Sequence, residues 1–384
     1  MNREVYITRS AACLPGEPVE NDAVEPLLGQ VGPRPSRARA TVLRSNGIRR
    51  RHYAIDRDSG RPTHTNAQLG AAAVRGLGDV GRVDCLAVGT STPDHLVPNQ
   101  GVMLHGELGW PALEVVALAG ICVAGTAALK HAWMALRCGE AQRAVSVATE
   151  LISPHLRAPH FQPELEQQVQ ALAARPELAF EKDFLRWMLS DGAAALLLEP
   201  EPTAALSLRL DWIDLSSAAH ELPACMYGGA RRNADGSLTP WTFLTPQEWL
   251  GESVFAVRQD VRLLNEHIGR AALSDPLERS VRRRGLRAEA IDWFLPHMSS
   301  AYFAPVVERG IATAGLPIPR ERWFTNLAER GNTGSASPFI MLDELWRSGR
   351  IEPGQRLLLF VPESGRFSSG FIHLTAVRGG PDGA

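Results

Sequence analysis

The most informative segment of this chain reads Gly120-Ile121-Cys122-Val123-Ala124-Gly125-Thr126-Ala127-Ala128-Leu129. A single cysteine stands among small residues where a helix is predicted to begin, and that helix continues to Cys138-Gly139. Free backbone N–H groups at a helix start carry partial positive charge, which favours a thiolate. Taken alone, the segment allows two interpretations: a nucleophilic cysteine, or a small buried residue of an alanine-rich core helix.

The unit around this helix occurs twice. A second helix is predicted to start at Asn332 and to end at Gly349, so the offset is 210 residues at both ends (122 to 332 and 139 to 349). Each helix leads into an apolar strand, at 144–150 and 357–363, and each follows another, at 83–92 and 291–300. Such self-similarity predicts a duplicated α/β unit built on covered sheets. Two halves related by a pseudo-dyad would place Cys122 and Asn332 at one cleft.

Four further strings stand in a recognisable order: Leu189–Leu197 with its Asp-Gly-Ala, Pro296-His297, Arg330–Ser337 and Glu363–Gly370. With the Cys122 segment they resemble the thiolase superfamily, and within it the ketoacyl synthase III branch. Gly334 and Ser335 depart from the family's Gly-Asn-Thr-Ser-Ala-Ala-Ser motif. Three other strings, at 208–215, 225–229 and 360–366, resemble the ketosynthase-cyclases that make dialkylresorcinol and stilbene precursors.

The resemblance implies an α/β thiolase fold, with two pseudo-duplicated halves in a five-layered α-β-α-β-α arrangement. Residues 1–200 would form the N-terminal half, which carries the nucleophilic cysteine, and residues 205–384 the C-terminal half with the histidine and asparagine. Residues 151–184 read as an insertion containing a predicted helix at 163–174, which would cap a substrate tunnel, build a dimer interface or simply decorate the surface.

The resemblance also implies a Claisen condensation, which needs a thiolate, a carbanion and two stabilised oxyanions. Cys122 would hold the acyl group, and His297 and Asn332 would donate to the thioester carbonyl of the extender unit. The backbone N–H groups of Cys122 and Gly365 would form the second oxyanion hole, where glycine permits close approach. Seen singly, His297 could be a core histidine and Asn332 a helix cap.

The predicted acyl donor follows from a residue that this chain lacks. The primary synthase III enzymes stack a coenzyme A adenine on a tryptophan ahead of a Gly-Ile-Arg segment, but residues 40–46 before Gly47-Ile48-Arg49 contain no tryptophan. This favours an acyl carrier protein as donor, with acyl-CoA as the alternative, and no cofactor is expected beyond these thioesters. A homodimer is expected.

Glu150 ends the strand after the nucleophile helix and is either a cyclisation base or a surface or interface residue.

Composition narrows the class of protein. The chain has 384 residues, 45% of them hydrophobic, and a net charge of −2, so no basic surface indicates nucleic-acid or membrane binding. No apolar run approaches the ~18 residues of a membrane span, and residues 1–7 predict a strand instead of a signal peptide. The five scattered cysteines form neither a disulfide framework nor a Cys-x-x-Cys metal site. We therefore expect a cytoplasmic protein without a metal.

Three functions are compatible with these observations. The first is a ketosynthase that condenses a Cys122-bound acyl group with a malonyl or β-ketoacyl partner and closes a ring to a cyclohexanedione. The second is an acyltransferase that passes the acyl group to a hydroxyl or amine without condensation. The third is an inactive partner subunit, which the retention of Cys122, His297 and Asn332 argues against.

Overall fold

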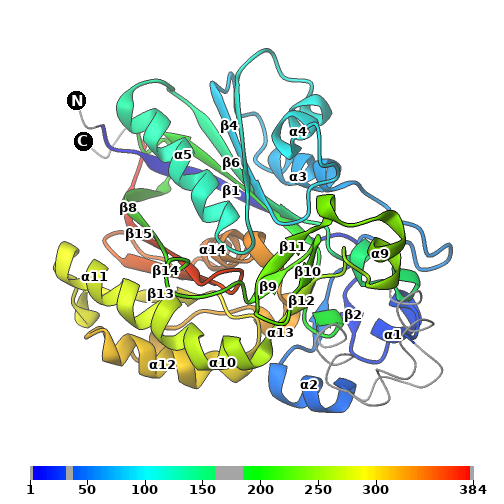
Figure 1. Cartoon of the computed structure of the whole chain (residues 1–384). Helices are drawn as coiled ribbons and strands as arrows, with labels where there is room; N and C mark the ends of the chain where they lie inside the picture. The colour runs from blue at the N-terminus through cyan, green and yellow to red at the C-terminus, as the bar shows by residue number, and fades with distance from the viewer. Residues whose placement is uncertain (1–2, 32–37, 161–184, 381–384) are drawn as a thin grey trace.

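A mixed sheet forms the centre of the molecule (Figure 1). The structure, a computed structural model, describes residues 3–31, 38–160 and 185–380. The nine described strands of the sheet lie in the order β13-β14-β15-β8-β1-β7-β6-β4-β5. The N-terminal half contributes β1 (Tyr6–Cys13), β4 (Cys85–Thr90), β5 (Glu114–Ala119), β6 (Ala144–Glu150) and β7 (Gly192–Glu199). The C-terminal half contributes β8 (Leu206–Ser217), β13 (Trp293–Pro296), β14 (Arg356–Glu363) and β15 (Ser368–Arg378).

The two half-sheets meet at a short seam. Strand β1 pairs with β8 only at Tyr6↔Arg209 and Ile7↔Leu208, whereas its pairing with β7 extends from Tyr6 to Cys13. Strands β4, β6 and β7 are buried along their whole length. This burial explains why their sequences are continuous apolar or small-residue runs without alternation, since both faces are covered.

Helices cover the half-sheets in layers (Figure 1). Helices α5 (Ala124–Cys138) and α14 (Ser337–Arg347) share one core cluster with strands of both halves, so they form the central layer. Helix α3 (Asn66–Arg75), beside α4 (Gln100–Leu108), covers the outer face of the N-terminal half. Helices α11 (Asp275–Arg284) and α12 (Ala304–Thr313), with α10 (Val261–Gly269), cover the C-terminal half. The predicted five-layered arrangement is confirmed.

Smaller elements decorate these layers. A π-helical turn at Arg270–Ser274 joins α10 to α11. Three two-stranded ladders pair β2 with β3, β9 with β12 and β10 with β11. The remaining bounds are α1 (Val24–Leu28), α2 (Ala38–Asn46), α9 (Pro246–Gly251), α13 (Leu327–Arg330), β2 (Val19–Glu20), β3 (Arg50–Arg51), β9 (Met226–Tyr227), β10 (Ala230–Arg232), β11 (Leu238–Pro240) and β12 (Arg258–Gln259).

The predicted repeat is visible as β4-α5-β6 and β13-α14-β14. Within each half the two strands run parallel and pair directly, β4 with β6 and β13 with β14. Both helices start later than the sequence predicted: α5 begins at Ala124, and α14 begins at Ser337 after a 3₁₀ turn, Gly334–Ala336. Cys122 and Asn332 therefore lie in the turns that precede the helices.

Two predictions, the helix in the insertion and the division of the chain into two halves, stay predictions. The part of the insertion that the structure describes contains two 3₁₀ turns, Ser153–Leu156 and Ala158–His160, while the helix predicted at 163–174 lies outside the described residues. The division at 1–200 and 205–384 stays an interpretation of the repeat. In the described ranges, no helix is long and apolar enough to cross a membrane.

Candidate active site

Three side chains singled out in the sequence line one cavity: Cys122, His297 and Asn332. Cys122 precedes α5, His297 follows the last residue of β13, and Asn332 precedes α14, so the duplicated halves supply opposite sides of the site. Most of the remaining lining is apolar and includes Leu185, Met188, Leu273, Met298, Phe303 and Phe360. The arrangement offers a nucleophile and two polar groups at the wall of a cavity suited to a hydrocarbon chain.

His297 is held in place by its backbone and is almost completely buried. Its N–H donates to the carbonyl of Phe360 at 2.8 Å, which fixes the end of β13 against β14. Burial lowers the pKa of His297 to about 4, so the imidazole is neutral at physiological pH. A neutral imidazole carries one N–H to donate, and its Nδ1 has no hydrogen-bond partner among the described residues.

Asn332 is oriented by three hydrogen bonds. Its backbone N–H donates to Met188 at 2.9 Å, and its backbone carbonyl accepts from Ser190 at 2.9 Å. Its side-chain oxygen accepts from the N–H of Gly334 at 3.0 Å. Because the amide oxygen is engaged in this turn, the amide NH₂ is the group left to donate, which is the polarity that an oxyanion requires.

The environment of Cys122 differs from the sequence-based expectation. A Glu363 oxygen accepts from the backbone N–H groups of Ile121 and Val123, at 3.0 and 3.1 Å. Burial, followed by the carboxylates of Glu363 and Glu150, raises the pKa of the Cys122 thiol well above its ordinary value. This direction is opposite to the sequence-based expectation that N–H groups at the helix start would favour the thiolate, and one of those groups, the Val123 N–H, donates to Glu363 instead.

Glu150 lies at the junction of the two halves and is not among the cavity-lining residues. Its carboxylate accepts from the Ser91 N–H at 3.0 Å, the Ser91 hydroxyl at 2.6 Å, the Thr92 hydroxyl at 3.0 Å and the Ser335 N–H at 3.1 Å. The Ser335 hydroxyl donates to it as well. Burial raises the pKa of Glu150, and the hydrogen bonds from Ser335 and Ser91 oppose that rise. These contacts link β4 and β6 to the turn before α14.

Comparisons with known proteins agree with this geometry. Residues 281–371 match the family model described as 3-oxoacyl-[acyl-carrier-protein (ACP)] synthase III C terminal. Beta-ketoacyl-[acyl-carrier-protein] synthase III of Xanthomonas oryzae pv. oryzae is 25% identical over 94% of this chain and 95% of its own length. The chain is thus similar to synthase III enzymes along nearly its whole length, and most closely matches their family model in its C-terminal part.

Solved structures show the same fold at low identity. The tetronic acid condensing enzyme AbyA1 superposes with a TM-score of 0.73 at 21% identity, over 97% of this chain and 99% of that one. Synthase III of Pseudomonas aeruginosa PAO1 gives a TM-score of 0.71 at 20% identity, over 99% and 100%. OleA of Xanthomonas campestris, solved with lauric acid and lauroyl-CoA, gives 0.69 at 19%, over 98% and 100%.

The departure from the superfamily motif at Gly334 has a local cause. Gly334 has a φ of +53°, and a Cβ there would lie 3.1 Å from Cδ of Glu150. A glycine is therefore required where the Glu150 carboxylate approaches the backbone. At Gly365, a Cβ would lie 2.9 Å from Cδ1 of Ile121, the movable end of a side chain, so this contact does not by itself require a glycine. Gly365 thus lies close to the segment that carries Cys122.

Sequence reasoning missed two features of the site. Glu363 was placed at the end of a predicted strand and in two family-like strings but was given no role, although it contacts the backbone on both sides of Cys122. The apolar lining contributed by Phe303, α12 and the turn before α11 was also missed. The available signal for Glu363 was an acidic residue at the end of an apolar strand, the same position that Glu150 has in the first half.

Proposed function

We propose that this protein is a ketosynthase that forms a carbon–carbon bond by Claisen condensation. An acyl group would be carried on Cys122 and condensed with a malonyl or β-ketoacyl thioester. The observation that supports this most directly is the convergence of Cys122, His297 and Asn332 on one largely apolar cavity. The similarity to synthase III along nearly the whole chain supports the same reaction class.

The roles of the three residues follow from their polarity. The Cys122 thiol loses its proton and attacks the donor thioester, and the donor's thiol leaves with a proton. When a malonyl extender loses carbon dioxide, negative charge develops on its thioester oxygen, where the Asn332 amide and the neutral His297 imidazole would donate. The carbanion then attacks the Cys122-bound carbonyl. The backbone N–H groups of Cys122 and Gly365 would stabilise that oxyanion until the thiolate leaves.

The finer function that we propose is cyclisation of the condensation product to a cyclohexanedione. It rests on the strings at 208–215, 225–229 and 360–366. The donor would be an acyl carrier protein or coenzyme A thioester, and no further cofactor enters the scheme. The second ring-forming bond needs a base, and Glu150 was the sequence-based candidate for it. Its five hydrogen bonds favour a bridging role, so Glu150 as a base stays a prediction.

The decisive experiment is incubation with acyl-CoA and acyl-carrier-protein donors, followed by an extender thioester, with mass detection of protein and product. We expect an acyl-enzyme that is lost in Cys122→Ala and kept in Cys138→Ala, and a product that has lost carbon dioxide or gained a ring. Acylation persisting in Cys122→Ala would overturn the mechanism. Transfer of an intact acyl group to a hydroxyl or amine would identify an acyltransferase instead.

A further inference from the structure

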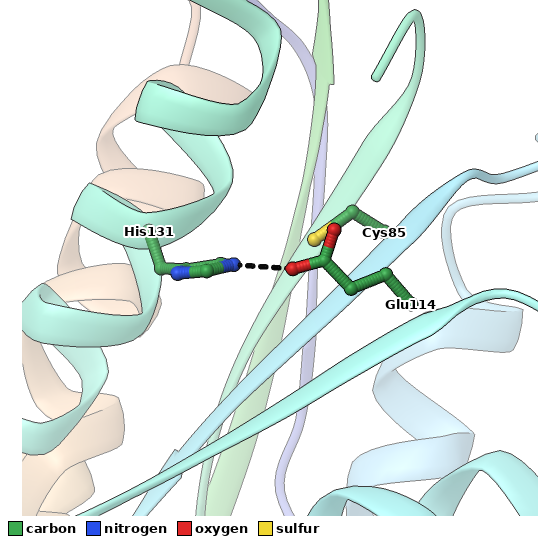
Figure 2. Close-up of side chains that lie close together, drawn as sticks. All are labelled: Cys85, Glu114 and His131. Atoms are coloured by element: carbon green, nitrogen blue, oxygen red, sulfur yellow. Dashed lines mark hydrogen bonds and ion pairs between the residues drawn. The ribbon is translucent and has the colours of Figure 1, made fainter. Parts of the chain in front are cut away.

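Three potential metal ligands from three elements lie close together beside the edge strand of the sheet (Figure 2). None of the three lines the Cys122 cavity. Cys85 begins β4, Glu114 begins β5 and is the register partner of Cys85, and His131 lies on α5. One ligand atom of each residue lies within 4.8 Å of the other two. His131 Nε2 and Glu114 Oε1 are 2.8 Å apart.

We propose that Cys85, Glu114 and His131 bind a divalent cation of the zinc type. A sulfur, an imidazole nitrogen and a carboxylate oxygen form a mixed donor set that Zn²⁺ accepts, whereas Mg²⁺ and Ca²⁺ prefer oxygen alone. Tetrahedral bonds of about 2.3 Å to sulfur and about 2.0–2.1 Å to nitrogen and oxygen place the ligand atoms about 3.3–3.6 Å apart. Side-chain rotations that move the ligand atoms by about 1 Å would bring their present spacing to these values.

Exposure of the three groups suits such a site. Cys85 is completely buried, and no hydrogen bond of its thiol is found among the described residues. The side chains of His131 and Glu114 are 32% and 48% exposed. The cation would thus be anchored from the interior by sulfur, with the two partly exposed ligands on the side of the edge strand β5. Three protein ligands leave a fourth position that water can fill.

The place of this site in the fold indicates a structural role. Cys85 starts β4, whereas Thr90 ends it next to Ser91, which contacts Glu150 near the catalytic cavity. The two ends are five residue steps apart, which separates them by about 16 Å. A cation here would join β4, the edge strand β5 and helix α5, and so stiffen the helix that follows Cys122. The proposal does not depend on the condensation reaction.

The test uses the full chain in a Cys122→Ala background, which removes the catalytic thiol as a competing ligand. After zinc loading and dialysis, we expect one zinc per chain and a higher melting temperature than for the chelated protein. Cobalt(II) should give a near-ultraviolet charge-transfer band from thiolate coordination. Both effects should be lost in His131→Gln, whose side chain is partly exposed, and in Cys85→Ala.

Two matched controls distinguish this site from ordinary surface binding. Cys138→Ala removes an exposed cysteine at the end of the same helix, and His267→Gln removes another histidine beside a glutamate, Glu266, at 3.6 Å. Neither should alter zinc retention or the cobalt spectrum. Zinc retention unchanged in His131→Gln, a cobalt complex without a thiolate band, or no retained zinc would each overturn the proposal.

Discussion

At the level of single residues, the polar groups around Cys122 are suited to two different steps. We propose that the Asn332 amide and the His297 imidazole donate to the extender thioester, and removing one oxyanion donor typically costs about 2.7–4 kcal/mol. We expect His297→Ala or Asn332→Ala to slow product formation about 100- to 1000-fold while acyl-enzyme still accumulates. Single-turnover loading followed by product analysis measures both steps. Equal loss of loading and condensation would refute this division of roles.

Glu363 gives a second test at this scale, based on charge. The titratable groups around the Cys122 thiol are the acidic Glu363 and Glu150 and the neutral His297, so removal of one negative charge favours the thiolate. We therefore expect Glu363→Gln to lower the pKa of Cys122. Its amide oxygen can still accept from the neighbouring backbone N–H groups, so the fold should be retained.

The measurement is the pH dependence of Cys122 alkylation by iodoacetamide, followed by mass spectrometry. In Glu363→Gln the midpoint should move to lower pH and the rate at pH 7 should rise. Glu201→Gln, an exposed carboxylate on the surface, is the matched control and should leave the profile unchanged. An identical profile in wild type and Glu363→Gln would contradict the charge argument.

At the level of elements, Glu150 connects the strand ends of the first half with the turn before α14. A glutamine could take its place, because the hydroxyls of Ser91 and Thr92 can accept as well as donate. An alanine at position 150 would leave several buried N–H and O–H donors without a partner, and each unpaired donor costs about 1–3 kcal/mol of stability. We therefore expect Glu150→Ala to melt at a lower temperature than Glu150→Gln.

The two variants also separate the proposed roles of this residue. As a cyclisation base, Glu150 would be needed only after the first condensation, so Glu150→Gln should load Cys122 and make linear product but little ring. A normal yield of cyclic product from folded Glu150→Gln would leave Glu150 with its bridging role alone.

Helix α12 supplies a test of the acyl cavity. Val306 lines the cavity, and its Cγ1 lies so near Gly269 that a Cβ on that glycine would be 3.0 Å away. A tryptophan in place of Val306 would fill cavity space that an acyl chain needs. From a mixture of acyl-CoAs of different length, Val306→Trp should load shorter chains than the wild type. An unchanged chain-length distribution on Cys122 would show that the acyl group lies elsewhere.

For the whole molecule, the sequence predicted the layers and the convergence of Cys122, His297 and Asn332 on one cavity, but not the other contacts between distant segments. The strand at 144–150 was found at its predicted bounds because its residues are continuously buried. Helix α5 starts two residues after Cys122, a boundary that backbone capping decides. Glu363 lies 240 residues from Val123 along the chain. Cys85, Glu114 and His131 share no local motif, and only sheet register and helix packing bring them together.

The edge of the sheet leads to a prediction about assembly. Strand β5 ends the strand order, and its residues are exposed or only partly buried. Nearby, Leu96 and Val97 on the loop after β4 are 74% and 83% exposed. An edge strand with unpaired backbone groups beside exposed apolar side chains is a surface that a second copy can cover. We predict a homodimer that pairs through β5, with the loop at 94–99 reaching toward the neighbouring cavity.

Light scattering at micromolar concentration should therefore give about twice the 41.8 kDa of one chain. Leu96→Asp places a charge on the loop that would be buried between the copies, and uncompensated burial of a carboxylate is costly. This variant should dissociate at concentrations where the wild type remains dimeric, and it should keep the melting behaviour of a folded chain. His220→Asp, which adds a charge to an exposed position in the C-terminal half, is the control and should stay dimeric. A wild-type mass of one chain at micromolar concentration would refute the dimer, and an unaltered dimer in Leu96→Asp would exclude this loop from the interface.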